Sequence, residues 1–139
     1  MSAKRIFFDT NILFYAHDTD AGRKHEIAAE AVSNAWEQAI HPIISVQVLQ
    51  ELLHNIRKKL HDDDQAVALV GDYMVWPVIA NDLGLFRTGM EAMRSHQLLL
   101  WDALIVAAAN RAGADELWTE DLNAGQLYGA VRAINPFAS

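Results

Sequence analysis

Four acidic residues lie far apart in the sequence, at positions where a carboxylate could do chemistry. Asp9 directly follows the apolar run Ile6 to Phe8, and Asp102 stands among apolar residues in "WDALIVAAA". Glu51 lies in "QELL" and Asp121 in "TED". Carboxylate oxygens bind Mg²⁺ or Mn²⁺, and a bound ion can orient a water molecule and lower its pKa. If the fold brings these acids together, they could form a hydrolytic metal site.

Asp9 has two interpretations. The apolar residues before it predict a short buried strand, and the turn-prone pair Thr10 and Asn11 follows it. An ionised carboxylate at the end of a buried strand needs a partner, because burying an unpaired charge is costly. Asp9 could cap the next helix by accepting hydrogen bonds from backbone amides, or it could bind a cation. Taken alone, the cap is the commoner role.

The other acids also have structural interpretations. Asp102 lies in the first turn of a predicted helix, where the helix dipole by itself favours a carboxylate. Glu120 and Asp121 follow a predicted strand, and acids in loops are usually solvated. A helical wheel places Glu51 almost opposite a leucine-rich stripe, which predicts a solvated face. Lys58 falls on the same side as Glu51, so a catalytic interpretation pairs an acid with a phosphate-binding cation.

Other candidate sites are weaker. The run His61 to Asp64 is typical of a helix N-terminus, because consecutive acids cannot all converge on one ion. The chain has no cysteine, and its six histidines show no His-x-x-x-His spacing, which argues against zinc. The four tryptophans are scattered singly on apolar segments, so we expect them in the core and not in a base-stacking platform.

The composition predicts one soluble domain over residues 1–139. Just over half of the residues are apolar, at 52%, which is enough for one hydrophobic core. The sequence shows no apolar window of membrane-spanning length and no secretory signal, so we expect a cytoplasmic protein with no membrane partner. The formal charge of -7 argues against passive coating of nucleic acid by lysine and arginine. It is compatible with metal-assisted chemistry on a nucleic acid.

Predicted strands and helices alternate along the chain, which implies a parallel sheet covered by helices on both faces. In such folds ligands bind beyond the carboxyl ends of the strands, where the strand order reverses. Asp9 and Asp121 each follow a predicted strand, so they could meet at that edge. The predicted strands are Ile6–Phe8, His41–Ile44, Val75–Ile79, Leu117–Thr119 and Ala130–Ile134. The main predicted helices are Arg23–Gln38, Val46–Leu60 capped by Ser45, Leu83–His96 and Trp101–Ala112.

Four motifs in this order, "FDTN", "QELL", "WDALIVAAA" and "TED", resemble those of the PIN-domain family of ribonucleases. In length the chain is similar to the stand-alone toxins of VapC type, and the resemblance extends from Ile6 to about Phe137. It implies a three-layer α/β/α sandwich around a central parallel sheet of four to five strands. It also implies homodimerisation and a small antitoxin partner whose tail covers the acidic edge.

The resemblance implies a role for each matched residue. The metal ligands would be Asp9, Asp102 and Asp121, and Glu51 would be a ligand or a base that orients water. The supporting polar residues would be Asn11 and Thr119, with Glu120 as an additional or substitute acid. The cofactor would be Mg²⁺ or Mn²⁺, as one ion or a pair, and the reaction would be hydrolysis of RNA, with Lys58 as a substrate-binding cation.

The sequence is also compatible with two other functions. The domain could bind a partner without catalysing a reaction, with its acids serving only as helix caps. A phosphatase of the haloacid-dehalogenase type also places an aspartate after its first strand and uses magnesium. That class needs a second aspartate two positions later, where this chain has Asn11, so we rank it below the other two.

Overall fold

The centre of the molecule is a mostly parallel sheet in the computed structural model, which describes residues 3–138. Four strands lie in the order β1-β4-β6-β5, and only β5 runs antiparallel to its neighbour. Two further strands, β2 and β3, form a parallel pair. The strands are β1 (Ile6–Phe8), β2 (Ile44–Ser45), β3 (Val78–Ile79), β4 (Glu116–Trp118), β5 (Leu127–Tyr128) and β6 (Val131–Ile134).

The β2–β3 pair continues the sheet on the other side of β1. Phe7 and Ile43 form a parallel bridge. The Phe8 amide donates to the Ile43 carbonyl at 3.0 Å, and the Ile43 amide donates to the Ile6 carbonyl at 2.8 Å. The chain therefore leaves β1 for β2 on one side and later returns to β4 on the other. This reversal lies at the carboxyl end of β1, where Asp9 follows.

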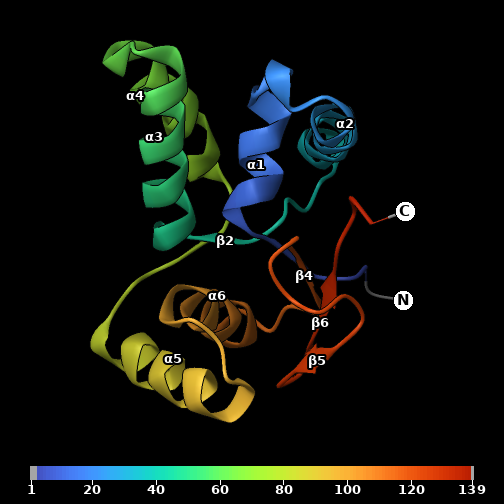
Figure 1. The fold of residues 1–139 in the computed structure, drawn as a ribbon, viewed down its shortest axis with the longest axis vertical. Helices are drawn as coiled ribbons and strands as arrows, with labels where there is room; N and C mark the ends of the chain where they lie inside the picture. Colours follow the sequence, from blue (N-terminus) through green and yellow to red (C-terminus); the bar gives the residue numbers. More distant parts are fainter. Residues whose placement is uncertain (1–2, 139) are drawn as a thin grey trace.

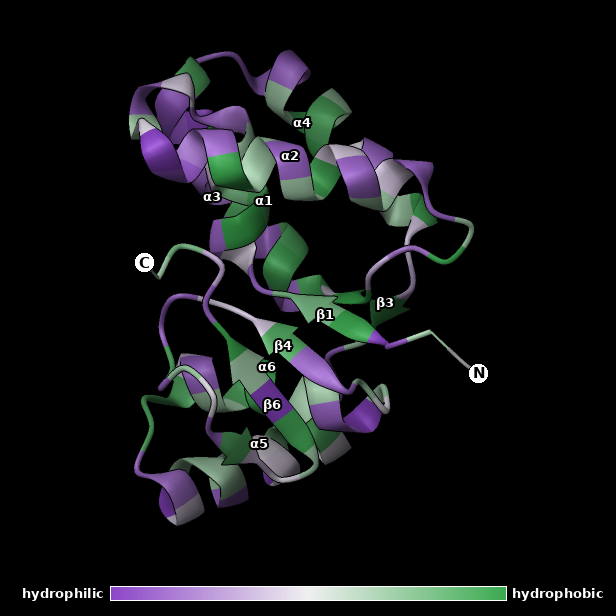
Figure 2. Ribbon diagram, turned by 90° about the vertical axis from the view of Figure 1, so that its right-hand side faces the viewer, coloured by the Kyte–Doolittle hydropathy of each residue, from purple (hydrophilic) through white to green (hydrophobic). Residues whose placement is uncertain are grey.

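Helices cover both faces of the sheet, as Figures 1 and 2 show. One layer holds α1 to α4, in which α1 packs against α2 and α3. The other layer holds α5 and α6, which pack closely together. The predicted three-layer α/β/α fold is therefore confirmed. The helices are α1 (Thr10–His17), α2 (Arg23–Glu37), α3 (Val46–Leu60), α4 (Asp63–Asp72), α5 (Leu83–His96) and α6 (Leu100–Arg111).

Helix α6 is buried because it lies between the sheet and α5. Its residues Ala103 and Ile105 to Ala109 are all buried, as its nearly continuous apolar sequence predicts. Gly89 of α5 allows the close approach of the two helices, since a methyl group there would collide with the Leu104 side chain. Glycine lowers helix propensity, and here close packing against α6 compensates for that cost. No helix within residues 3–138 is long and apolar enough to cross a membrane.

Several local predictions need correction. Thr10 and Asn11, predicted as a turn, form the beginning of helix α1. The antiparallel strand β5 was not predicted, because its two residues show no clear sequence pattern. The third strand starts only after Pro77, whose carbonyl accepts from the Ile44 amide at 2.9 Å. A proline has no amide hydrogen but can still accept in a sheet.

The tryptophan prediction holds only in part. Trp76 is buried, but Trp36 is 36% exposed and Trp101 is 63% exposed. The prediction that all four tryptophans belong to the core is therefore wrong for Trp36 and Trp101. The position of Trp101 near the acids is described below.

Candidate active site

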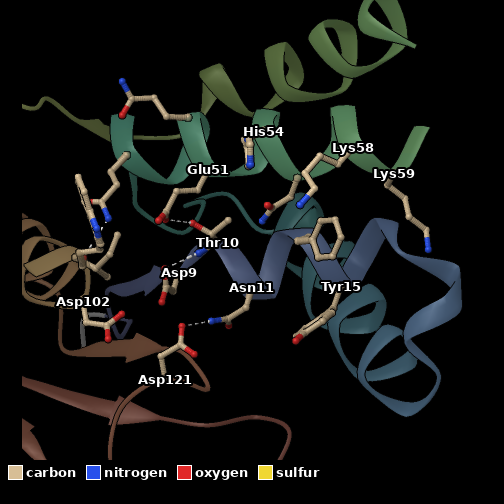
Figure 3. A pocket seen from close by; sticks show the side chains of 16 residues that line it. Asp9, Thr10, Asn11, Tyr15, Glu51, His54, Lys58, Lys59, Asp102 and Asp121 are labelled. Atoms are coloured by element: carbon tan, nitrogen blue, oxygen red, sulfur yellow. Dashed lines mark hydrogen bonds between the residues drawn. The ribbon is translucent and has the colours of Figure 1, made fainter. Parts of the chain in front are cut away.

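The predicted acids lie around one pocket at the carboxyl edge of the sheet. Asp9, Glu51, Asp102 and Asp121 line this pocket, whose volume is about 730 Å³. Asp9 follows β1, Glu51 lies on α3, Asp102 lies in the first turn of α6, and Asp121 follows β4. Figure 3 shows the four side chains around the pocket. The fold therefore brings together acids that are separated by up to 112 positions in the sequence.

Asp9 is both a helix cap and a pocket residue. Its side chain is only 6% exposed. The Thr10 amide donates to Asp9 Oδ1 at 2.7 Å, and the Thr119 hydroxyl donates to Asp9 Oδ2 at 2.8 Å. The two interpretations of the sequence are thus compatible, because the cap bond uses one oxygen and orients the carboxylate toward the pocket.

Glu51 is tied to Asp9 through Thr10. The Thr10 hydroxyl donates to Glu51 Oε1 at 2.7 Å, while the amide of the same residue binds Asp9. Glu51 is half-buried, because the side of α3 that carries Gln47, Glu51 and Lys58 faces the pocket next to α1. The helical wheel predicted a solvated face because it could not include packing against α1.

Asp121 is held at the rim of the pocket by its neighbours. Asn11 Nδ2 donates to Asp121 Oδ2 at 3.1 Å, and the Asp121 amide donates to the Thr119 hydroxyl at 3.1 Å. Asp102 lies half-buried on the facing helix, with no hydrogen-bond partner for its side chain among the described residues. None of the ion pairs within residues 3–138 includes any of the four pocket acids.

The unpaired acids disfavour one another's ionisation. Burial raises the pKa of Asp9 to about 7, two hydrogen bonds oppose this shift, and the charges of Asp121 and Glu51 add to it. Burial also raises the pKa of Asp102, again with contributions from Asp121 and Glu51. Partial burial raises the pKa of Asp121, and the adjacent Glu120 adds to the shift. A cation in the pocket would relieve this repulsion.

Glu120 is directed away from the pocket. The Tyr15 hydroxyl donates to Glu120 Oε1 at 2.6 Å, and Lys24 Nζ donates to Glu120 Oε2 at 2.7 Å. The lysine also lies 5.1 Å from the centre of the Tyr15 ring. Glu120 does not line the pocket, whereas Asp121 does. The neighbouring acids therefore occupy different environments, and only Asp121 faces the other three.

The donor set of the pocket suits a hard divalent cation. Its acidic groups are the carboxylate oxygens of the four acids, and Asn11, which lines the same pocket, donates through Nδ2 to Asp121. Oxygen ligands of this kind suit Mg²⁺ and Mn²⁺, which also retain water molecules. In the described part of the chain, no three acids or histidines are close enough to form a complete metal site. Bound water molecules or side-chain adjustment would have to complete the coordination.

Some pocket residues were not singled out from the sequence. The sequence places Thr10 only in a turn, whereas in the structure its hydroxyl and amide connect two acids. Trp101 and His54 also line the pocket. Lys58 lies there as predicted, and it forms no ion pair within the described residues, whereas neighbouring Lys59 pairs with Asp18 at 3.1 Å. The motif "FDTN" contains Thr10, but only the packing of α1 against α3 reveals its connection to Glu51.

The fold and the pocket together define an α/β/α domain with acids at the carboxyl edge of its parallel sheet. The family model of the PIN domain matches residues 6–129. This chain belongs to the PIN domain family. The family match leaves the haloacid-dehalogenase alternative without support.

Solved structures share this fold at low sequence identity. A toxin–antitoxin complex from Klebsiella pneumoniae aligns with a TM-score of 0.68 and 22% identity, over 96% of this chain and 98% of that one. Mycobacterium tuberculosis VapC20, a sarcin–ricin-loop-cleaving toxin, aligns with a TM-score of 0.66 and 18% identity, over 81% of this chain and 86% of that one. The DNA-bound VapBC of Salmonella typhimurium aligns with a TM-score of 0.64 and 17% identity, over 94% of this chain and 97% of that one. No curated protein matches the sequence.

Proposed function

We propose that this protein is a metal-dependent endoribonuclease that acts as the toxin of a toxin–antitoxin pair. One observation carries the proposal: four carboxylates from separate segments share one pocket, and within the described residues none of them forms an ion pair with a cationic side chain. Such an arrangement is unfavourable for stability alone, so it favours a catalytic role.

Asp9, Asp102 and Asp121 would hold the metal, supported by Asn11 and Thr119. A bound Mg²⁺ or Mn²⁺ would lower the pKa of an attacking water and neutralise charge on the phosphodiester. The Thr119 hydroxyl fixes one oxygen of Asp9 by donating to it at 2.8 Å. Asn11 orients Asp121 through the bond at 3.1 Å.

Glu51 is suited to orient the water molecule and accept its proton. Thr10 occupies Glu51 Oε1, whereas Oε2 has no hydrogen-bond partner among the described residues. The bond from Thr10 fixes the carboxylate, so the free oxygen has a defined direction. A general base in this position must lie within hydrogen-bond reach of the water that it activates.

The substrate would be single-stranded or looped RNA, because an unpaired phosphodiester can enter a recessed acidic pocket more easily than one in a duplex. Lys58, which lines the pocket and is free of ion pairs in the described part of the chain, would bind a neighbouring phosphate. The similar M. tuberculosis toxin cleaves the sarcin–ricin loop, which supports an RNA substrate. The particular RNA depends on features beyond this pocket.

The partner would be a small antitoxin, since structurally similar proteins were solved as toxin–antitoxin complexes. An arginine in the antitoxin could occupy the acidic pocket and replace the charge of the metal. We also expect the homodimer that the resemblance implies. Co-expression with the product of a neighbouring small reading frame, followed by co-purification, would test the pairing.

The direct test is incubation of the purified protein with single-stranded RNA and Mg²⁺. We expect internal cleavage that EDTA abolishes and that Asp9→Asn abolishes as well. Asp64→Asn is a matched control, because Asp64 is an exposed acid outside the pocket. RNA binding without cleavage by the wild-type protein would instead favour the non-catalytic alternative. Cleavage that survives both EDTA and Asp9→Asn would overturn the proposal.

A further inference from the structure

Trp101 differs from the other tryptophans in its surroundings. Trp36 and Trp76 pack against each other with ring centres 4.9 Å apart, and Trp118 packs against Phe8 at 5.4 Å. Trp101 lies in the pocket wall, is 63% exposed, and has no aromatic partner among the described residues. Its indole therefore offers an uncovered flat face within the acid-lined pocket.

The backbone at Trp101 is fixed although its side chain is exposed. Gln47 Nε2 donates to the Trp101 carbonyl at 3.0 Å, and Gln47 itself is only 6% exposed. Trp101 directly precedes Asp102, in the first turn of α6. The exposed indole is thus anchored beside one of the acids, in the wall of the pocket.

We propose that Trp101 forms a base-binding subsite, in which its indole stacks on an unpaired base of the RNA next to the phosphate at the acids. This inference rests on the proposed function. The acids and the metal would act on phosphate and water, and they offer nothing apolar to a base. Tryptophan stacks on any base, which positions a single strand without reading its sequence.

The opposite part of the pocket could bind the next part of the same RNA strand. Lys58 lies in the last turn of α3, away from α6, and the polar residues His54 and Asn55 lie between it and Glu51. An RNA strand that crosses the pocket would therefore contact the Trp101 indole first, then the acids, and then Lys58. This order of groups matches base, scissile phosphate and flanking phosphate in a nucleotide chain.

A fluorescence titration tests the subsite separately from cleavage. The protein is titrated in Ca²⁺, which also takes oxygen ligands, with single-stranded RNA or with an oligomer of equal length whose riboses lack bases. Electrophoresis of the recovered RNA verifies that it is intact. We expect RNA, but not the abasic oligomer, to quench the fluorescence of Trp101. The quenching should disappear in Trp101→Phe and persist in Trp36→Phe, which removes the other tryptophan that is at least 36% exposed.

Affinity and kinetics give a second readout. Trp101→Ala should weaken RNA binding roughly 10-fold, and Trp101→Phe, which keeps an aromatic face, only about 2-fold. In cleavage assays Trp101→Ala should raise KM by a similar factor and change kcat by less than about 2-fold. Equal binding of RNA and the abasic oligomer, or unchanged affinity in Trp101→Ala, would overturn the subsite.

The remaining outcomes separate the two proposals. If Trp101-dependent RNA binding occurs but Mg²⁺ supports no cleavage, the proposed nuclease activity fails while the base-binding subsite stands. If cleavage occurs with no contribution from Trp101, the subsite fails while the nuclease stands. Sedimentation of Trp101→Ala is the last control: a lower mass than that of the wild type would identify Trp101 as a contact between copies of the chain and overturn the subsite.

Discussion

Several acids outside the pocket form ion pairs within residues 3–138, whereas none of the four acids inside it does. Asp82 accepts two hydrogen bonds from Arg111, at 2.8 and 2.9 Å, and this pairing lowers the pKa of Asp82. Arg57 likewise lowers the pKa of Asp63. In the pocket the pKa of Asp9 is raised to about 7. Asp82 and Asp63 on the surface thus have cationic partners, whereas the pocket acids where the strands end form no ion pair within the described residues.

The contrast is sharpest between the adjacent residues Glu120 and Asp121. Lys24 and Tyr15 neutralise and bind Glu120, whereas Asp121 receives only a neutral bond from Asn11. Adjacent acids that both faced the pocket would increase the repulsion. The comparison indicates that Glu120 already has its cation, whereas Asp121 and the other pocket acids are arranged to receive one.

The largest expected effect separates this adjacent pair. Asp121→Asn should reduce RNA cleavage by about 100-fold or more, because it removes a charge that would stabilise the metal. Glu120→Gln should reduce cleavage by less than about 10-fold, because Glu120 only positions the loop. The rates are measured in Mg²⁺ with one RNA substrate. Equal losses in the two variants would remove the distinction between paired and unpaired acids.

The second prediction concerns the pH dependence of stability in metal-free protein. The pKa of Asp9 is about 7 in the folded protein, against an ordinary value of 3.8, so the unfolded chain loses this proton first as the pH rises. The free energy of unfolding should therefore fall between about pH 4 and 7 and level off above that range. Asp9→Asn keeps a capping residue and should be more stable at pH 8, by roughly 2 to 4 kcal/mol.

Denaturant unfolding at pH 5 and pH 8 in EDTA measures this difference. The stabilisation by Asp9→Asn should be larger at pH 8 than at pH 5. Added Mg²⁺ should stabilise the wild type more than the variant, because binding to the folded state shifts the equilibrium. A variant that is less stable than the wild type at pH 8 would contradict the idea that burial of this charge is costly.

A third, smaller effect should follow when Glu120 loses its ion pair with Lys24. Lys24→Met removes the cation from Glu120 and leaves an additional negative charge next to Asp121. We expect the cleavage rate to fall about 3- to 10-fold with little loss of stability, because the pair is partly exposed. Lys24→Arg should restore most of the rate. If Lys24→Met leaves both kcat and KM unchanged, the pairing of Glu120 has no influence on the site.

The smallest effect is expected at a surface pair. Asp82 caps α5, because its Oδ1 accepts from the Leu85 amide at 2.8 Å. Asp82→Asn keeps a capping residue there and weakens only the pair with Arg111. The melting temperature should fall by no more than a few degrees, and RNA cleavage should stay unchanged. Thermal unfolding and the cleavage assay provide the two measurements. A large loss of cleavage would show that the surface acids are not separate from the site.

The sequence predicts the fold class because its strong helices and short strands alternate. It predicts the positions of Asp9 and Asp121 because the ends of parallel strands meet at one edge. The direction of Glu51 could not be predicted, since it depends on the packing of α3 against α1. Trp101 is similar: it lies in a mostly apolar stretch of the sequence, but the N-terminus of α6 opens into the pocket. Strand β5 is a two-residue antiparallel addition, too short to leave a periodic pattern.

The most direct test of the account is Mn²⁺ binding, followed by the electron paramagnetic resonance signal of the free ion. The wild-type protein should remove Mn²⁺ from solution at a defined stoichiometry, and Asp64→Asn should bind equally well. Asp9→Asn should lose this binding, because the unpaired charge that favours the cation is gone. Wild-type protein that leaves the Mn²⁺ signal unchanged, or binding that Asp9→Asn retains in full, would contradict the assignment of the four pocket acids to a metal site.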